Sequence, residues 1–134
     1  MKSKISILIL LFGTFFSCKN EVKEEAKISE NPVQTDIQLV QFHTEHRCVT
    51  CNNIEKLSKE TIKGNEVISF VLFNVDDEKN AKVAEQFEAT GTSLYLYNSK
   101  TKAIKDLTEM AFMYAKTEGD KFKTELQKEI STFK

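Results

Sequence analysis

Apolar and polar positions from residue 37 onward alternate between strand-like and helix-like patterns. Residues 37–43 (IQLVQFH) form a short strand candidate. Residues 67–75 (VISFVLFNV) are apolar at nearly every position, which predicts a central strand with both faces covered. Residues 93–97 and 103–107 predict a hairpin around the polar turn at 98–101. Four strands are therefore expected.

Three helices are expected between and after these strands. Their inward-facing positions recur at helical spacing: Ile54, Leu57, Thr61 and Ile62 in the first, Val83, Ala84 and Phe87 in the second, and Phe122, Leu126, Ile130 and Phe133 in the third. Gly64 is placed to end the first helix, Asp76 or Asp77 to cap the second, and Gly91 to close it. For the apolar cluster at 110–114, core packing is favoured over a partner-docking turn. The order β-α-β-α-β-β-α predicts an α/β fold with a four-stranded mixed sheet and a helix covering each face.

The first residues follow a different pattern. Lys2 and Lys4 precede an apolar run at 5–16, which is shorter than the roughly twenty apolar residues that a bilayer-spanning helix needs. A charged start, a short apolar run and a small residue before the cut are the parts of a secretory signal. Residues 14–18 (TFFSC) resemble a bacterial lipobox. That resemblance implies cleavage before Cys18, lipidation of its sulfur and acylation of its new amine; an ordinary secretory signal with an incidental cysteine is the alternative.

The 134 residues are enough for one domain and a leader. We expect a lipoprotein signal peptide at 1–17, a lipidated cysteine and flexible tether at 18–36, and a folded domain at 37–134. Two or more acyl chains give stable membrane attachment, so the protein should be anchored in the cell envelope, facing the periplasm or the exterior. Cleavage removes two lysines and moves the net charge from −1 to −3. Nucleic acid is not an expected partner, because phosphate binding needs a cationic surface. The domain is expected to be a monomer.

Two cysteines, Cys48 and Cys51, fall between the first strand and the first helix. A helix N-terminus offers unpaired N–H groups and a partial positive charge, which stabilise a thiolate. Arg47 and His46 stand beside Cys48 and should add to that field. Cys48 is thus expected to be the exposed, more acidic nucleophile, and Cys51 the shielded resolving thiol. Outside the cytoplasm such a pair can form a disulfide.

Several landmarks along the chain resemble thioredoxin. They are residues 39–42 (LVQF), the pair Cys48 and Cys51 on a helix, residues 74–76 (NVD) and residues 91–94 (GTSL). The resemblance covers roughly residues 37–133, without the extra N-terminal strand and helix of full-length thioredoxins. Together with the lipobox, the plan is similar to thioredoxin-family lipoproteins of Bacteroidetes-like bacteria. It implies a thioredoxin-like three-layer fold and a thiol–disulfide oxidoreductase that acts on protein or small-molecule disulfides and needs no cofactor.

Some positions depart from the thioredoxin pattern. Ser93 stands where thioredoxins keep a cis-proline, and Thr92–Ser93 is expected to be trans because a cis bond without proline costs about 3–4 kcal/mol. Gln41 stands where thioredoxins bury an aspartate as a proton acceptor, and a neutral amide cannot take that role at pH 7. Arg47 replaces the usual tryptophan. The thiol chemistry of the pair is expected to remain, with Thr92 and Ser93 facing the substrate.

Two other functions remain open. His43, His46, Cys48 and Cys51 lie within nine residues, and this donor set suits zinc or copper. Such a site requires both imidazole rings close to both sulfurs. The second alternative is a redox-sensing binding module that keeps the fold without turnover. A structural, inert pair would instead have a buried Cys48.

Overall fold

The computed structural model describes residues 35–134; the predicted signal peptide, Cys18 and most of the tether lie outside these residues. The elements follow one another as β1 (Ile37–His43), α1 (Val49–Ile62), β2 (Ile68–Asn74), a 3-10 turn η1 (Glu78–Asn80), α2 (Ala81–Gln86), β3 (Ser93–Asn98), β4 (Ile104–Asp106), α3 (Thr108–Tyr114) and α4 (Gly119–Thr132). In this part of the chain, no helix combines the length and apolar character needed to cross a membrane.

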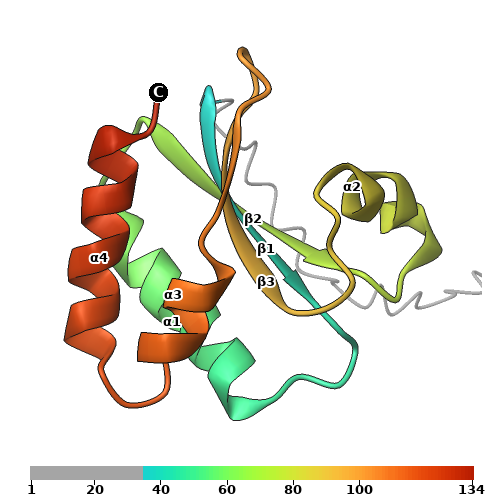
Figure 1. The fold of residues 1–134 in the computed structure, drawn as a ribbon, viewed down its shortest axis with the longest axis horizontal. Coiled ribbons are helices and arrows are strands. Elements are labelled where there is room, and N and C mark those ends of the chain that lie inside the picture. The colour runs from blue at the N-terminus through green and yellow to red at the C-terminus, as the bar shows by residue number, and fades with distance from the viewer. Residues whose placement is uncertain (1–34) are drawn as a thin grey trace, which may run out of the picture. The chain divides into compact units, whose positions relative to one another are not determined.

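Four strands form one mixed sheet in the order β2-β1-β3-β4 (Figure 1). β1 and β2 run parallel and are connected through α1. β3 runs antiparallel to both β1 and β4. In the middle of the sheet, Gln41 of β1 pairs with Leu72 on one side and with Leu94 on the other. This topology confirms the predicted α/β class and the four-stranded mixed sheet of a thioredoxin-like fold.

Successive side chains along the strands point to opposite faces of the sheet, and a separate apolar cluster covers each face. Leu39 and Leu96 belong to the cluster formed with α1, α3 and α4. Phe42 and Tyr95 belong to the other cluster, which includes Ala84 of α2. The two groups of helices lie on opposite sides of the strands in Figure 1. Helices therefore cover both faces, as the sequence predicts.

β2 is an edge strand, which corrects the prediction of a central one. β1 and β3 occupy the interior of the sheet, and only the first residue of β2, Ile68, is buried. Phe70 packs against the cluster on one face, while Val71 and Phe73 pack against the cluster on the other. The apolar run correctly indicates that both faces are covered. It carries no information about neighbours in the plane of the sheet, so it could not distinguish a central strand from an edge strand.

A helix absent from the sequence-based order, α3, lies between β4 and α4. Asp106 precedes it, and its carboxylate accepts a hydrogen bond from the backbone N–H of Thr108 at 2.8 Å. Ala111 and Ala115 face the core and are almost fully buried. The cluster at 110–114 is therefore helical, and the chain has one more helix than β-α-β-α-β-β-α. A seven-residue helix is too short to show a clear 3.6-residue period.

The predicted ends of the first two helices differ in accuracy. Gly64 follows α1 with φ +80°, in the left-handed region that glycine adopts at helix ends. Asp77, one of the two residues predicted as a cap, caps the η1 turn that leads into α2. α2 ends well before Gly91, so this glycine does not close it. Instead Glu88 turns the chain with φ +53°.

The ordered contacts begin slightly before the predicted start of the domain. The Thr35 hydroxyl lies 3.0 Å from the Ser69 hydroxyl on β2 and 2.8 Å from the Ile37 carbonyl. The Asp36 carboxylate pairs with the Lys100 ammonium at 2.7 Å in the β3–β4 turn. The last two residues of the segment assigned to the tether are therefore fastened to the sheet.

Candidate functional site

The two cysteines lie where β1 passes into α1. A short loop after β1 leads to Cys48, the N-cap residue of α1. Within this loop the Thr44 hydroxyl donates to the backbone carbonyl two residues later, at 3.0 Å. The backbone N–H of Glu45 donates to the Asp76 carboxylate at 2.7 Å, which fastens the loop to the segment after β2. The loop that leads to the pair is thus braced internally and fastened to the segment after β2.

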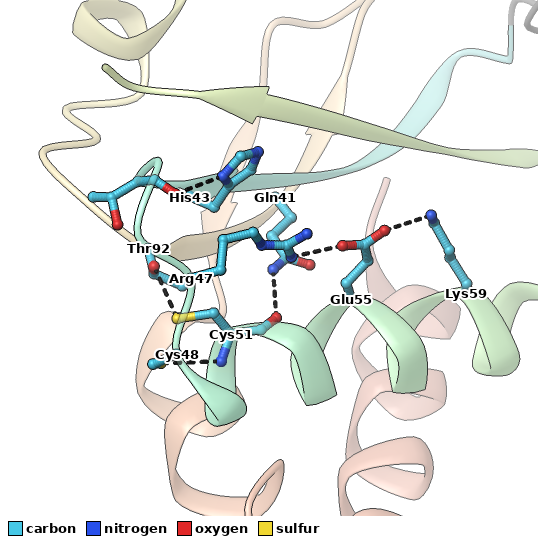
Figure 2. A network of polar contacts seen from close by, with 9 residues as sticks. Gln41, His43, Arg47, Cys48, Cys51, Glu55, Lys59 and Thr92 are labelled. Atoms are coloured by element: carbon cyan, nitrogen blue, oxygen red, sulfur yellow. Dashed lines mark hydrogen bonds and ion pairs between the residues drawn. The ribbon is translucent and has the colours of Figure 1, made fainter. Parts of the chain in front are cut away.

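Cys48 is exposed to solvent and caps the helix with its own sulfur. Its backbone is extended, with φ −84° and ψ 167°, and its Sγ accepts the backbone N–H of Cys51 at 3.3 Å (Figure 2). The first turn of α1 contains no acidic residue, so no carboxylate there opposes a negative charge on the sulfur. A thiolate at this position is stabilised by the helix N–H groups and the partial positive charge of the helix end.

Cys51 lies in the first turn of α1 and is only 4% exposed. Its Sγ lies 3.2 Å from the Thr92 hydroxyl, in the loop that precedes β3 (Figure 2). Burial alone would raise the pKa of the Cys51 thiol, but hydrogen bonds with Cys48 and Thr92 outweigh it, and the pKa lies below its ordinary value. Both cysteines are free thiols. The contact with Thr92 does not involve Cys48, so it remains beside the Cys51 sulfur when Cys48 is bonded to a substrate.

Gln41 lies directly beneath the start of α1. It is fully buried, and its side-chain amide donates to the Cys51 carbonyl at 3.0 Å. The oxygen of the same side-chain amide, Oε1, is buried without a hydrogen-bond partner among the described residues. Gln41 therefore supports the helix backbone under Cys51 at the position where the thioredoxin pattern has an aspartate. Being neutral, it adds no negative charge beneath the thiols.

The Arg47 side chain runs along α1 instead of toward Cys48. Its Nη2 lies 2.6 Å from the Glu55 carboxylate, and Lys59 contacts the same carboxylate at 2.6 Å (Figure 2). Arg47 Nε and Nη2 are buried without a well-aligned hydrogen-bond acceptor, so the contact with Glu55 is mainly an ion pair. Burial would raise the pKa of Glu55, but contacts with Lys59 and Arg47 outweigh it and lower the pKa. The cation expected to act on Cys48 is thus neutralised by Glu55.

The remaining candidate residues are dispersed around the pair. His43 is half-buried at the end of β1, with Nδ1 2.8 Å from the Thr44 carbonyl, and His46 is exposed in the loop. Ser93 is buried and its hydroxyl donates to the Gly91 carbonyl at 3.3 Å, so Thr92 rather than Ser93 reaches a sulfur. Among residues 35–134 no three histidine, cysteine or acidic side chains are grouped to hold a metal ion. The alternative metal site draws no support from this arrangement.

The roles of two polar residues around the site, Glu55 and Asp76, are not predicted by the sequence analysis. Glu55 has a detectable local signal, because a glutamate four residues before Lys59 is a favourable pair on a helix. The contact between Glu55 and Arg47 has no such local signal, because it joins a residue of the loop to the second turn of the helix. Asp76 is one of the two residues predicted to cap the second helix, but Asp77 supplies that cap. The Asp76 carboxylate instead accepts a hydrogen bond from the loop before Cys48. These roles depend on tertiary contacts that no local spacing reports.

No protein-family model matches the sequence, and no curated protein matches it either. Among solved structures, one described as the structure of a malarial protein is similar with 20% identity and a TM-score of 0.41, over 59% of this chain and 94% of that one. Human ERp44 in a zinc-bound form is similar with 13% identity and a TM-score of 0.44, over 69% of this chain. The match spans 27% of the ERp44 chain. At this level of similarity, neither structure assigns an activity to this chain.

Proposed function

We propose that the domain carries out thiol–disulfide exchange, with Cys48 as the nucleophile and Cys51 as the resolving thiol. The observation that carries the proposal is the difference between the two sulfurs. Cys48 is exposed at the N-terminus of α1 and accepts a helix N–H, whereas Cys51 is buried behind it against Thr92. An accessible, stabilised thiolate beside a shielded second thiol is the arrangement that disulfide exchange requires.

The exchange proceeds in two steps. The Cys48 thiolate attacks one sulfur of a substrate disulfide, the substrate S–S bond breaks, and the other substrate sulfur leaves as a thiolate. Cys51 then loses its proton and attacks the Cys48 sulfur, which releases the second substrate thiol. The protein ends with a Cys48–Cys51 disulfide, and the two electrons of the pair have passed to the substrate. A dithiol reductant is needed to restore the protein, and an oxidant would drive the reverse reaction.

Thr92 and Gln41 serve the second step. The hydrogen bond between Thr92 and the Cys51 sulfur favours the thiolate that must form there. Gln41 donates a hydrogen bond to the Cys51 carbonyl and so fixes the helix turn that carries Cys51. This keeps the Cys51 sulfur behind the Cys48 sulfur. Neither side chain is charged, so both act by orientation and hydrogen bonding.

Single serine variants test the order of attack. In the full chain, Cys51→Ser should retain half of a peptide disulfide as a stable adduct on Cys48, visible as a mass increase. The matched variant Cys48→Ser should retain at least tenfold less, because burial restricts access to Cys51. Equal adduct formation in the two variants would contradict the assignment of the nucleophile, and absence of adducts in both would contradict the proposed function.

We further propose that the protein is tethered to the envelope membrane by lipid on Cys18. The support is the order of a charged start, an apolar run and the lipobox-like TFFSC sequence. Expression of the full chain in a bacterium that processes lipoproteins should give a membrane-associated product lacking residues 1–17 and carrying acyl mass. Cys18→Ser should lose both the acyl mass and the membrane association. An intact, unmodified Cys18 in the wild type would refute the tether.

A further inference from the structure

β4 forms one edge of the four-stranded sheet, and part of its backbone points away from the other strands. In an antiparallel ladder, residues that bond to the neighbouring strand alternate with residues that face the other way. The Leu107 N–H donates to the Leu94 carbonyl at 2.8 Å, so Lys105, two residues earlier, also faces β3. Ile104 and Asp106 alternate with them and point their backbone N–H and C=O groups outward. All of β4 is exposed, so these groups are open to pairing with a further strand.

A pocket lies beside β4 on the face of the sheet that α2 covers. The buried rings of Phe87 and Tyr95 line it, together with the side chain of Ile104, which is 39% exposed. Glu88 and Asp106 add carboxylates to the lining. Aromatic rings and carboxylates both attract cations, and an aliphatic stem packs well on apolar side chains. The pocket therefore suits the side chain of a lysine or an arginine.

A second pocket lies beside β4 on the opposite face of the sheet, the face covered by α3 and α4 (Figure 1). Met110 and Met113 of α3 contribute apolar surface to it. Lys105 also lines this pocket, and its ammonium is paired with the Glu129 carboxylate. The carboxylates around the pocket outnumber this ammonium and come from Asp106, Glu109, Glu125 and Glu129. An excess of negative charge over apolar surface again suits a cationic group on an aliphatic stem.

A strand added to β4 would reach both pockets with neighbouring residues. Successive side chains of a strand point to opposite faces of the sheet. A residue opposite Asp106 would point to the pocket that contains Tyr95, and the next residue, opposite Lys105, would point to the pocket of α3 and α4. Asp106 lines both pockets, so the two lie on either side of the same short strand. The complementary sequence is therefore an extended segment with two consecutive basic residues.

The chain itself does not supply such a segment. Its 134 residues contain no two consecutive lysine or arginine residues. A second copy of the chain, or its own first residues, would therefore fill only one of the two pockets. The complementary segment belongs to another polypeptide.

We infer that the β4 edge binds an extended segment of a partner polypeptide that carries two consecutive basic residues. The segment pairs with the outward backbone groups of Ile104 and Asp106, and each pocket takes one basic side chain. Backbone hydrogen bonds supply affinity in this mode of binding, and the side-chain pockets supply specificity. The surface contains neither cysteine, so the inference does not rest on the proposed thiol–disulfide exchange.

Two labelled peptides of equal composition test the pattern. The peptide SVTKRVTS has consecutive basic residues, whereas in SVKTRVTS they are separated by one residue and point to the same face. Fluorescence anisotropy with the reduced full chain at low ionic strength should show about fivefold weaker binding of the second peptide, because one pocket stays empty. Methyl groups on alternate backbone nitrogens of the first peptide should weaken binding about tenfold in one of the two possible sets only, the set that faces β4.

Variants of the protein assign the two pockets. Glu88→Gln and Glu109→Gln each remove a carboxylate from one pocket and should raise the Kd of SVTKRVTS about threefold. Glu78→Gln is the matched control, because Glu78 is an exposed carboxylate that lines neither pocket, and it should leave the Kd unchanged. In a nuclear magnetic resonance titration, the amide signals of Ile104 and Asp106 should shift.

Several results would overturn the inference. Equal binding of the two peptides, or an equal effect of Glu78→Gln, would show a general attraction between charges instead of recognition at β4. Absence of binding by SVTKRVTS would exclude the complementary segment itself. A peptide that shifts the amide signal of Phe70 on β2, and not those of Ile104 and Asp106, pairs with the other edge of the sheet, and the inference is then wrong.

Discussion

Replacing Glu55 with glutamine tests whether the ion pair with Arg47 fastens the loop before Cys48 to α1. The Glu55 carboxylate lies 2.6 Å from both Arg47 Nη2 and Lys59 Nζ, and its side chain is 18% exposed. Glutamine has the same shape but no charge. Arg47 then keeps its half-buried guanidinium without a carboxylate partner.

The loss follows from how buried each contact is. The contact between Arg47 and Glu55 is mainly an ion pair, and ion pairs that water reaches contribute about 0.2–1 kcal/mol. The two side chains are only 25% and 18% exposed, so the contribution lies in the upper part of that range. The exposed contact with Lys59, four residues along the helix, adds only about 0.3–0.5 kcal/mol. We therefore expect Glu55→Gln to lower the free energy of unfolding by about 1 kcal/mol at pH 7.

Urea unfolding of the full chain, followed by circular dichroism, measures this loss. Glu60→Gln is the matched control, because Glu60 also pairs with a lysine, Lys123 at 2.8 Å, but in a more exposed setting, and it should lose distinctly less. The pKa of Glu55 is lowered in the folded state, so its contribution is complete above the ordinary pKa of 4.5 and disappears as the pH falls through the folded value. Equal losses in the two variants, or a Glu55→Gln loss that persists in acid, would refute the reasoning.

Three further substitutions follow from the same structure. Thr92→Val removes the hydroxyl beside the Cys51 sulfur and should raise the pKa of that thiol, measured by ultraviolet titration of the thiolate; an unchanged titration would show that this contact is not made. Ser58→Ala removes a fully buried hydroxyl that has no hydrogen-bond partner among the described residues, so urea unfolding should show no loss or a gain of up to about 1 kcal/mol. A clear loss of stability would reveal a partner for Ser58. Phe122→Ala empties a fully buried site in the cluster under α4 and should cost about 3–5 kcal/mol in the same assay; a loss under 1 kcal/mol would contradict the packing described.

Much of the fold could be predicted because its signals are local. The strand at 37–43 and the helix ending before Gly64 agree with β1 and α1, since apolar spacing and a glycine stop act within a few residues. The hairpin of β3 and β4 was found from its polar turn. The placement of Cys48 at a helix start was predictable for the same reason, because the strand and helix patterns adjoin the cysteine pair.

The features that could not be predicted depend on contacts between distant segments. The position of β2 at the sheet edge is decided by strand order, which an apolar run does not encode. The short α3 is stabilised mainly by burying Ala111 and Ala115 against the core. Arg47 was expected to act on Cys48 because it is adjacent in sequence, but Glu55 lies within its reach on the folded helix and carries the opposite charge. Adjacency in sequence did not determine the electrostatic partner.

The accessibility of one sulfur tests the central claim most directly. The reduced full chain is treated briefly with iodoacetamide at neutral pH, and peptide mapping by mass spectrometry then measures alkylation at Cys48 and Cys51 separately. The exposed, helix-capped sulfur of Cys48 should be modified at least tenfold faster than the buried sulfur of Cys51. Modification of Cys51 first, or a Cys48 that resists the reagent in the folded protein, would contradict the account.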